Sequence, residues 1–137
     1  MSLTMTIVNM AQSFVGSNNI NLLMPNGQFG SRNQGGKDHA SARYIFTNLN
    51  KVTRYIFPEP DDHTLTYLED DGQLVEPEFY VPIIPMCLVN GSEGIGSGWS
   101  TNVPNFDPRE ITQVLISKLR DDQDFTSLKP FFKGYAG

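Results

Sequence analysis

The sequence GGKDHASARYIFTN, residues 35–48, places an Arg-Tyr pair behind a glycine pair and a lysine. Glycine lets the backbone approach a ligand closely, and Lys37 and Arg43 bring positive charge to the segment that leads to Tyr44. An ordinary phenol has a pKa of about 10 and needs help to become a nucleophile; neighbouring cations favour the phenolate and also hold a phosphate. The residues alone leave two interpretations open. Tyr44 fills a core at the start of a strand or helix, or its phenol lies at the edge of a basic surface and meets a phosphate.

Charge is distributed unevenly along the chain. Residues 1–57 contain five Lys or Arg and one acid, Asp38, for a net charge of +4, whereas the remaining residues contain five Lys or Arg and fourteen acids, for a net charge of −9. The overall charge of −5 argues mildly against nucleic-acid binding. Because surface potential is local, the basic first part is the stronger clue and favours a phosphate-rich partner.

Length and composition indicate a globular protein. The 137 residues correspond to one domain or to pieces of two, and 39% hydrophobic residues suffice for a modest core. Cys87 is the only cysteine, which excludes a disulfide framework and fits a reducing compartment. No apolar run reaches the roughly 18 residues of a membrane span, and the first residues lack the basic segment of a signal peptide. No membrane partner is expected.

Periodicity predicts a helix followed by a small hairpin in the first part of the chain. Apolar side chains at helical spacing predict an amphipathic helix over residues 1–14, with the apolar stripe in the core. The stripe consists of Leu3, Ile7, Met10 and Phe14. Turn signals then bracket residues 19–24 and 27–31, which are expected to pair as a hairpin, with the loop of Arg32 and Lys37 as part of a wing.

Residues 64–76 are expected to form a second hairpin, because alternating residues flank the turn dipeptide Asp71-Gly72. Acidic residues cluster around this hairpin: Asp61, Asp62, Glu69, Asp70, Asp71, Glu76 and Glu78. Most of them sit in turns and lack the spacing of metal ligands, which favours a solvated face over a metal site.

The segment FYVPIIPMCLVN, residues 79–90, is expected to be a buried strand that leads into a glycine loop and then extended chain. Gly94, Gly96 and Gly98 match a dinucleotide fingerprint only in part, since no helical pattern follows them. A nucleotide-binding module that uses Gly91 to Gly98 is therefore the weakest alternative.

A capping arrangement of Asp107, Pro108 and Glu110 predicts the start of a helix, which we interpret as scaffold. Its inward-facing residues are expected to be Ile111, Val114, Leu115 and Leu119. The tail, LKPFFKGYAG at residues 128–137, is expected to have no core of its own.

Two long motifs carry a family resemblance. GQFGSRNQGGKDHASARYIFTNL, residues 27–49, and PEFYVPIIPMCLVNGSEGIGSGWSTNVPNFDPREI, residues 77–111, closely resemble the breakage-and-rejoining region of eukaryotic-type (type IIA) DNA topoisomerase II. The resemblance covers nearly the whole chain and implies a mixed α/β (α+β) fold. It further implies the C-terminal part of a winged-helix domain in residues 1–83 and the beginning of the tower domain in residues 84–137.

The resemblance assigns roles to individual residues. It implies that Tyr44 attacks a DNA phosphodiester and forms a transient 5'-phosphotyrosyl link during ATP-dependent double-strand passage, with Arg43 stabilising the charged phosphorane. It implies that Ile95 wedges between base pairs and bends the DNA; the residues alone leave a buried strand end as the other interpretation. The further DNA-binding residues are expected to be Arg32, Gly36 and Lys37, and no metal ligand is expected in this chain.

Cofactors and partners follow from the same resemblance. It implies an isomerase that binds double-stranded DNA, acts as a homodimer in the nucleus, and receives the acidic metal cluster from the partner subunit. Magnesium and ATP are expected to bind to regions that this chain does not contain, so the chain is interpreted as a fragment that is inactive alone. The alternative is a non-catalytic winged-helix DNA-binding module.

Overall fold

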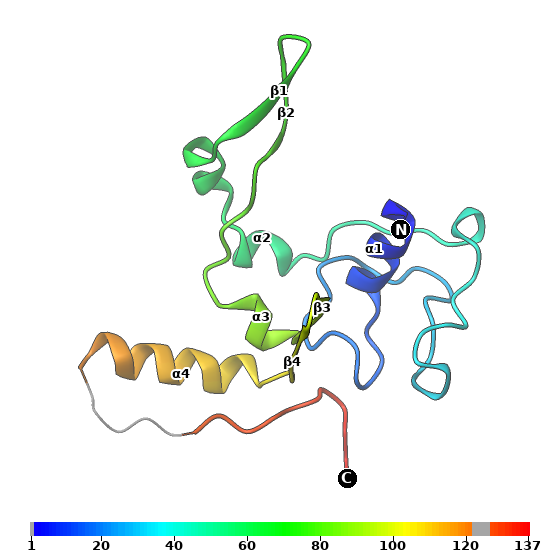
Figure 1. The fold of residues 1–137 in the computed structure, drawn as a ribbon, viewed down its shortest axis with the longest axis vertical. Helices are drawn as coiled ribbons and strands as arrows, with labels where there is room; N and C mark the ends of the chain where they lie inside the picture. Colours follow the sequence, from blue (N-terminus) through cyan, green and yellow to red (C-terminus); the bar gives the residue numbers. More distant parts are fainter. Residues whose placement is uncertain (1, 122–126) are drawn as a thin grey trace.

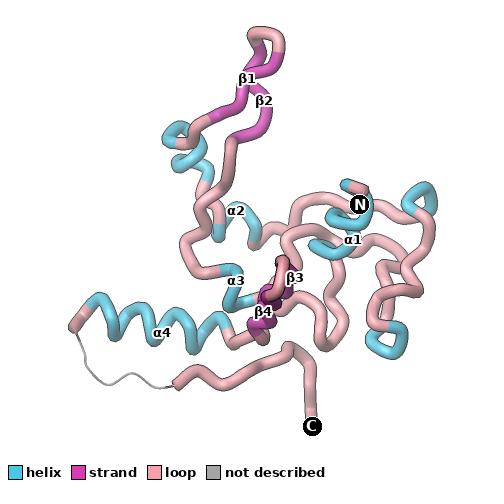
Figure 2. Tube along the Cα trace, viewed as in Figure 1, coloured by secondary structure: helices cyan, strands magenta, loops and turns pink. Residues whose placement is uncertain are grey.

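The computed structural model describes residues 2–121 and 127–137. Within these residues, short helices and two small antiparallel sheets are joined by long loops (Figure 1, Figure 2). The helices are α1 (Leu3–Ala11), α2 (Thr53–Ile56), α3 (Met86–Val89) and α4 (Pro108–Leu119), with 3-10 helices η1 (Arg32–Gln34), η2 (Ala42–Tyr44) and η3 (Glu59–Thr64). The strands are β1 (Tyr67–Asp70), β2 (Gln73–Pro77), β3 (Ser92–Gly96) and β4 (Trp99–Val103). The predicted mixed α/β class is confirmed.

Helix α1 is shorter than predicted and buries a different face. It ends at Ala11, so Phe14 lies beyond it. Val8 and Ala11 are buried against Phe29, whereas Leu3 is 75% exposed. The predicted core stripe is therefore wrong for Leu3, because Phe29 packs over a neighbouring face where the small Ala11 allows close approach.

The hairpin predicted between residues 19–24 and 27–31 is wrong. The extended chain after α1 instead runs antiparallel to residues 46–50. Phe46 N donates to Asn26 O at 3.0 Å, and Asn26 N donates to Phe46 O at 3.2 Å. Turn signals favour pairing between segments that are neighbours in the sequence. Here the long intervening loop brings residues 46–50 alongside instead, and backbone hydrogen bonds can join extended segments that lie far apart in the sequence.

The hairpin predicted around Asp71-Gly72 is confirmed as β1 and β2, which project from the rest of the chain (Figure 1). Asp71 and Gly72 have φ values of 49° and 77°, as the two central residues of a primed hairpin turn require. In the part of the chain that the structure describes, no three His, Cys, Asp or Glu side chains are grouped so that they could hold a metal ion.

The buried strand predicted over residues 79–90 is wrong. The chain runs as a loop up to Pro85 and then forms α3, and Ile83 is 61% exposed. Val89 is the only buried residue of the segment. Pro82 and Pro85 explain the difference, because proline has no N–H to donate to a ladder and is tolerated just before a helix.

Strands β3 and β4 form a regular hairpin where a glycine loop followed by extended chain was expected. The predicted extended chain is confirmed as β4. The predicted glycine loop is wrong, because part of it forms strand β3. Gly91 precedes β3 with φ 73°, and a Cβ there would lie 2.6 Å from both Val103 O and Asn105 Oδ1. Only glycine fits at this position, so it fixes where the hairpin begins.

Helix α4 starts as predicted. The Asp107 carboxylate accepts the backbone N–H of Arg109 over 2.9 Å, and Ile111 is buried. Leu119, predicted to face inward, is 87% exposed, because the last turn of α4 lies away from α3 (Figure 1). Among the described residues no helix has both the length and the apolar character that crossing a membrane requires.

Asn19 joins segments that are distant in the sequence. This side chain is 5% exposed, and its Nδ2 lies 3.0 Å from the backbone oxygens of Val89, Phe106 and Phe131. Its Oδ1 accepts the backbone N–H of Lys133 over 2.9 Å. The tail, expected to have no core of its own, is therefore linked through one buried amide to the end of α3 and to the residues just before α4.

Candidate functional site

Arg43 and Tyr44 lie together on η2, a single turn closed by the bond from Tyr44 N to Ser41 O at 2.9 Å. Tyr44 is 70% exposed, which excludes the interpretation that it fills the core of this chain. The Arg43 guanidinium carbon lies 5.4 Å from the centroid of the Tyr44 ring, within the range of a cation–π contact. A phosphate that approached this phenol would therefore also meet a guanidinium.

Hydrogen bonds to Asp38 stabilise the loop that carries Arg32 and Lys37. Its carboxylate accepts the backbone N–H and the hydroxyl of Ser31, both at 2.8 Å, and the side-chain amide of Gln28 at 3.2 Å. The bond from the Ser31 backbone is the main cause that holds the pKa of Asp38 below its ordinary value. The only acid of the first 57 residues thus forms its hydrogen bonds with groups of the same loop.

Gly36 is buried, and its neighbour is the side chain of Gln12. Gln12 is 8% exposed, and its Nε2 donates to Phe29 O at 3.0 Å and to Gly36 O at 3.3 Å. A Cβ on Gly36 would overlap this amide, so close packing alone accounts for the glycine. Sequence reasoning missed Gln12, because a polar residue just past a helix end gives no signal of burial.

Three of the remaining basic residues differ in their surroundings. Lys37 is exposed, while the Arg32 guanidinium carbon lies 5.4 Å from the centroid of the Tyr135 ring, near the other end of the chain. Arg54 pairs with Asp62 at 2.8 Å, so its charge is partly neutralised. The loop between α1 and α2 therefore presents Arg32, Lys37 and Arg43 without a carboxylate partner among the described residues.

Ile95 lies on β3 opposite Ser100 and is 90% exposed. The interpretation as a buried strand end is therefore wrong for this chain. A Cβ on Gly94 would meet nothing within 4 Å, and one on Gly96 would meet only Trp99 O at 3.8 Å. The surface of the hairpin on either side of Ile95 is therefore not covered by other parts of the chain that the structure describes. Trp99 is 84% exposed on the same hairpin and was missed, since an isolated tryptophan resembles a core residue in sequence.

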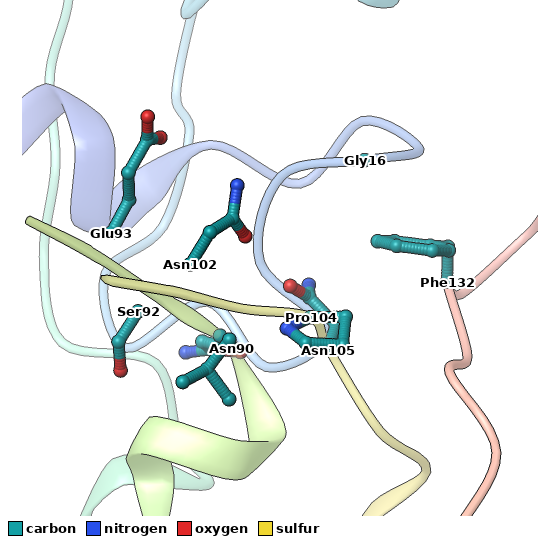
Figure 3. Close-up of a pocket in the computed structure, with 10 residues that line it drawn as sticks. Gly16, Asn90, Ser92, Glu93, Asn102, Pro104, Asn105 and Phe132 are labelled. Carbon is teal, nitrogen blue, oxygen red and sulfur yellow. The ribbon is translucent and has the colours of Figure 1, made fainter. Parts of the chain in front are cut away.

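An open pocket of about 320 Å³ lies at the base of β3 and β4 (Figure 3). Polar side chains that include Asn90, Glu93, Asn102 and Asn105 line it. The Asn90 side-chain amide both donates to Ile20 O at 2.8 Å and accepts from Ile20 N at 2.9 Å. It thus makes the same two hydrogen bonds with Ile20 that the backbone of a paired strand residue would make. None of the six predicted site residues lines the pocket, so it is separate from the Arg43–Tyr44 site.

Comparisons with known proteins show which family the chain resembles. The family described as the A-subunit of DNA gyrase/topoisomerase IV matches residues 1–137. DNA topoisomerase 2-alpha of Homo sapiens is 59% identical over 137 residues, and DNA topoisomerase 2 of Pisum sativum is 58% identical over 136 residues. The chain spans 9% of the length of each of these relatives.

One solved structure extends the similarity to three dimensions. The crystal structure of the Plasmodium falciparum topoisomerase II DNA-binding, cleavage and re-ligation domain matches with a TM-score of 0.88 and 51% identity. The match covers 96% of this chain and 18% of that chain. The resemblance inferred from the two long motifs is confirmed.

Proposed function

Because this chain belongs to the DNA gyrase/topoisomerase IV A-subunit family, we propose that it forms part of the DNA breakage-and-rejoining core of a type IIA DNA topoisomerase. The observation that carries the proposal is the exposed Tyr44 phenol beside the Arg43 guanidinium, on a loop whose Arg32 and Lys37 have no carboxylate partner in the part of the chain that the structure describes. The surrounding fold supports it, since it is similar over nearly its whole length to a DNA-binding, cleavage and re-ligation domain.

In the proposed reaction, the Tyr44 oxygen forms a bond to a DNA phosphorus while the bond from that phosphorus to the 3'-oxygen breaks. The phenol loses its proton, the 3'-oxygen gains one, and the products are a 5'-phosphotyrosyl link and a free 3'-hydroxyl. Arg43 stabilises the negative charge that grows on the phosphoryl oxygens, and reversal of the same steps rejoins the strand. Between the two steps a second duplex passes through the gap.

The DNA is held by groups on two parts of the chain. Arg32 and Lys37 bind phosphates on the loop around the reacting tyrosine, where Gly36 keeps the backbone turn tight. Ile95, at the exposed face of the β3–β4 hairpin, wedges between base pairs, and the unstacking of about a few kcal/mol is offset by the added contacts of bent DNA.

Magnesium and ATP belong to other parts of the proposed enzyme. The described residues do not bring together three carboxylate, histidine or cysteine ligands, so they do not fit a magnesium site of their own. We place residues 1–83 in the winged-helix domain and residues 84–137 at the start of the tower domain of a nuclear homodimer. The isolated chain is expected to give no ATP-dependent relaxation of supercoiled DNA.

The test is covalent trapping on a nicked duplex by the enzyme that contains this segment. Tyr44→Phe removes only the reacting oxygen, so we expect the covalent adduct to disappear while DNA binding stays within about twofold. Arg43→Ala is expected to slow cleavage by about 100-fold or more and to weaken binding much less, because its contact strengthens in the transition state. Tyr55→Phe, a change at a tyrosine that is 76% exposed, is the matched control and should form the adduct normally.

A persistent adduct with Tyr44→Phe would show that another residue is the nucleophile. DNA binding without any adduct, even in the unmodified enzyme, would favour a non-catalytic DNA-binding module instead.

A further inference from the structure

The contact between Arg32 and Tyr135 joins the DNA-facing loop to the tail of the chain. The guanidinium carbon of Arg32 lies 5.4 Å from the centroid of the Tyr135 ring. No carboxylate of the described residues lies within 4.0 Å of the Arg32 guanidinium, so this ring is its one charge-complementing partner there. A guanidinium held over an aromatic face keeps the N–H donors at its edge available to a phosphate.

Tyr135 is held in place by backbone bonds that do not involve its ring. Phe131 N donates to Asn105 O at 2.8 Å, and Lys133 N donates to Asn19 Oδ1 at 2.9 Å. Tyr135 N then closes a turn onto Phe132 O at 3.0 Å, with Gly134 at φ 80° in the position where that turn requires a left-handed residue. The tail therefore presents the ring from a fixed backbone, although Tyr135 as a residue is 56% exposed.

We propose that Tyr135 is a positioning residue for DNA binding, which holds the Arg32 guanidinium in the orientation that meets a DNA phosphate. The inference rests on the proposed function, because it takes Arg32 to be a phosphate contact. A free arginine on a loop must lose its side-chain freedom when it binds, whereas one already held in a cation–π contact has lost part of that freedom beforehand.

A double-mutant cycle in the enzyme that contains this segment tests the proposal, with anisotropy of a fluorescent duplex as the readout. Tyr135→Leu is expected to weaken binding by about two- to fivefold, and Tyr135→Phe, which keeps the ring, is expected to bind normally. In an Arg32→Ala background, Tyr135→Leu should cause no further loss, because the residue it positions is gone. Tyr55→Leu, at an exposed tyrosine of α2, is the control and should leave binding unchanged.

A general structural role for Tyr135 predicts a different result. If the ring only helped the tail to fold, Tyr135→Leu would weaken binding equally with and without Arg32, and that outcome would overturn the proposal. Arg32→Lys gives an independent measurement that leaves Tyr135 intact: it keeps the charge but not the planar group, and is expected to weaken binding about as much as Tyr135→Leu. Normal binding by Arg32→Lys or by Arg32→Ala would equally contradict the proposal.

The outcome is separable from that of the proposed function. Loss of the adduct in Tyr44→Phe together with no coupling between Arg32 and Tyr135 would keep the enzyme and remove the positioning role. An adduct that survives Tyr44→Phe would remove the proposed nucleophile, while the coupling measured by anisotropy would still report how Arg32 is held.

Discussion

Gly36 combines a left-handed backbone with a position against the buried amide of Gln12, and the two constraints add. Gly36→Ala is expected to lower the free energy of unfolding by about 2–4 kcal/mol, because a Cβ carries the left-handed penalty of about 1–2 kcal/mol and also displaces the Gln12 side chain. Urea unfolding at neutral pH measures the change.

Gly35 supplies the matched control for that prediction. Its φ is 59°, but a Cβ there would meet nothing within 4 Å. Gly35→Ala should therefore cost only the backbone penalty, about 1–2 kcal/mol. Equal losses for the two variants would show that the contact with Gln12 does not contribute to stability.

At the scale of single elements, the start of α4 depends on an ionised carboxylate. Hydrogen bonds from the Arg109 side chain are the main cause that lowers the pKa of Asp107 from its usual value of 3.8. A lowered folded pKa means that the carboxylate stabilises the fold fully above about pH 4 and that this contribution is lost as the pH falls through the folded pKa. Asp107→Ala is expected to cost about 0.5–2 kcal/mol at pH 7 and little at the acid end of that window, by urea unfolding at each pH.

Asp107→Asn distinguishes the cap from the charge. Asparagine keeps an acceptor for the Arg109 N–H but not the charge, so at neutral pH Asp107→Asn should cost less than Asp107→Ala, while the pH dependence from this position should disappear. The Arg109 side chain is 84% exposed, so the ion pair itself is expected to add little. A large loss at pH 7 in Asp107→Asn would instead assign the stability to the charge.

The β3–β4 hairpin leads to a prediction in which stability and function separate. Ile95 is 90% exposed, so Ile95→Ala should change the free energy of unfolding by less than about 0.5 kcal/mol. In the enzyme that contains this segment, the same change should reduce DNA bending, since nothing then fills the opened base step. Fluorescence transfer between the ends of a bound duplex measures the bend, and Leu119→Ala is the control at an equally exposed apolar residue. Normal bending by Ile95→Ala would rule out the wedge.

For the whole molecule, Asn19 connects the N-terminal third of the chain to α3, α4 and the tail. Asn19→Ala would leave three backbone oxygens and the Lys133 N–H without their present partner. We expect a loss of at least about 3 kcal/mol in the free energy of unfolding, and faster hydrogen exchange at the Lys133 amide. Asn33→Ala, at an exposed asparagine, should change neither quantity. Unchanged exchange at Lys133 in Asn19→Ala would show that the tail is held by other contacts.

The sequence by itself determined the features that depend on neighbouring residues or on long motifs. The turn at Asp71-Gly72 and the cap at Asp107 were predicted correctly, because a few consecutive residues set the backbone there. The family and the mixed α/β class were also predictable, since the two motifs are long, occur in order and carry a resemblance that extends over nearly the whole chain. The arginine and tyrosine of the candidate site could be chosen from these motifs as well, although their roles stay predictions.

Only the tertiary structure decided which distant segments meet. The pairing of Asn26, the hydrogen bonds of Gln12 and the contact of Arg32 with the Tyr135 ring all join parts of the chain that lie far apart in the sequence. A glutamine or asparagine in a loop has the same local preferences whether it is solvated or buried, so no pattern marked Gln12 or Asn19. Their positions follow from the backbone groups that folding brings within hydrogen-bond distance, because a buried amide is stable only where those groups can pair with it.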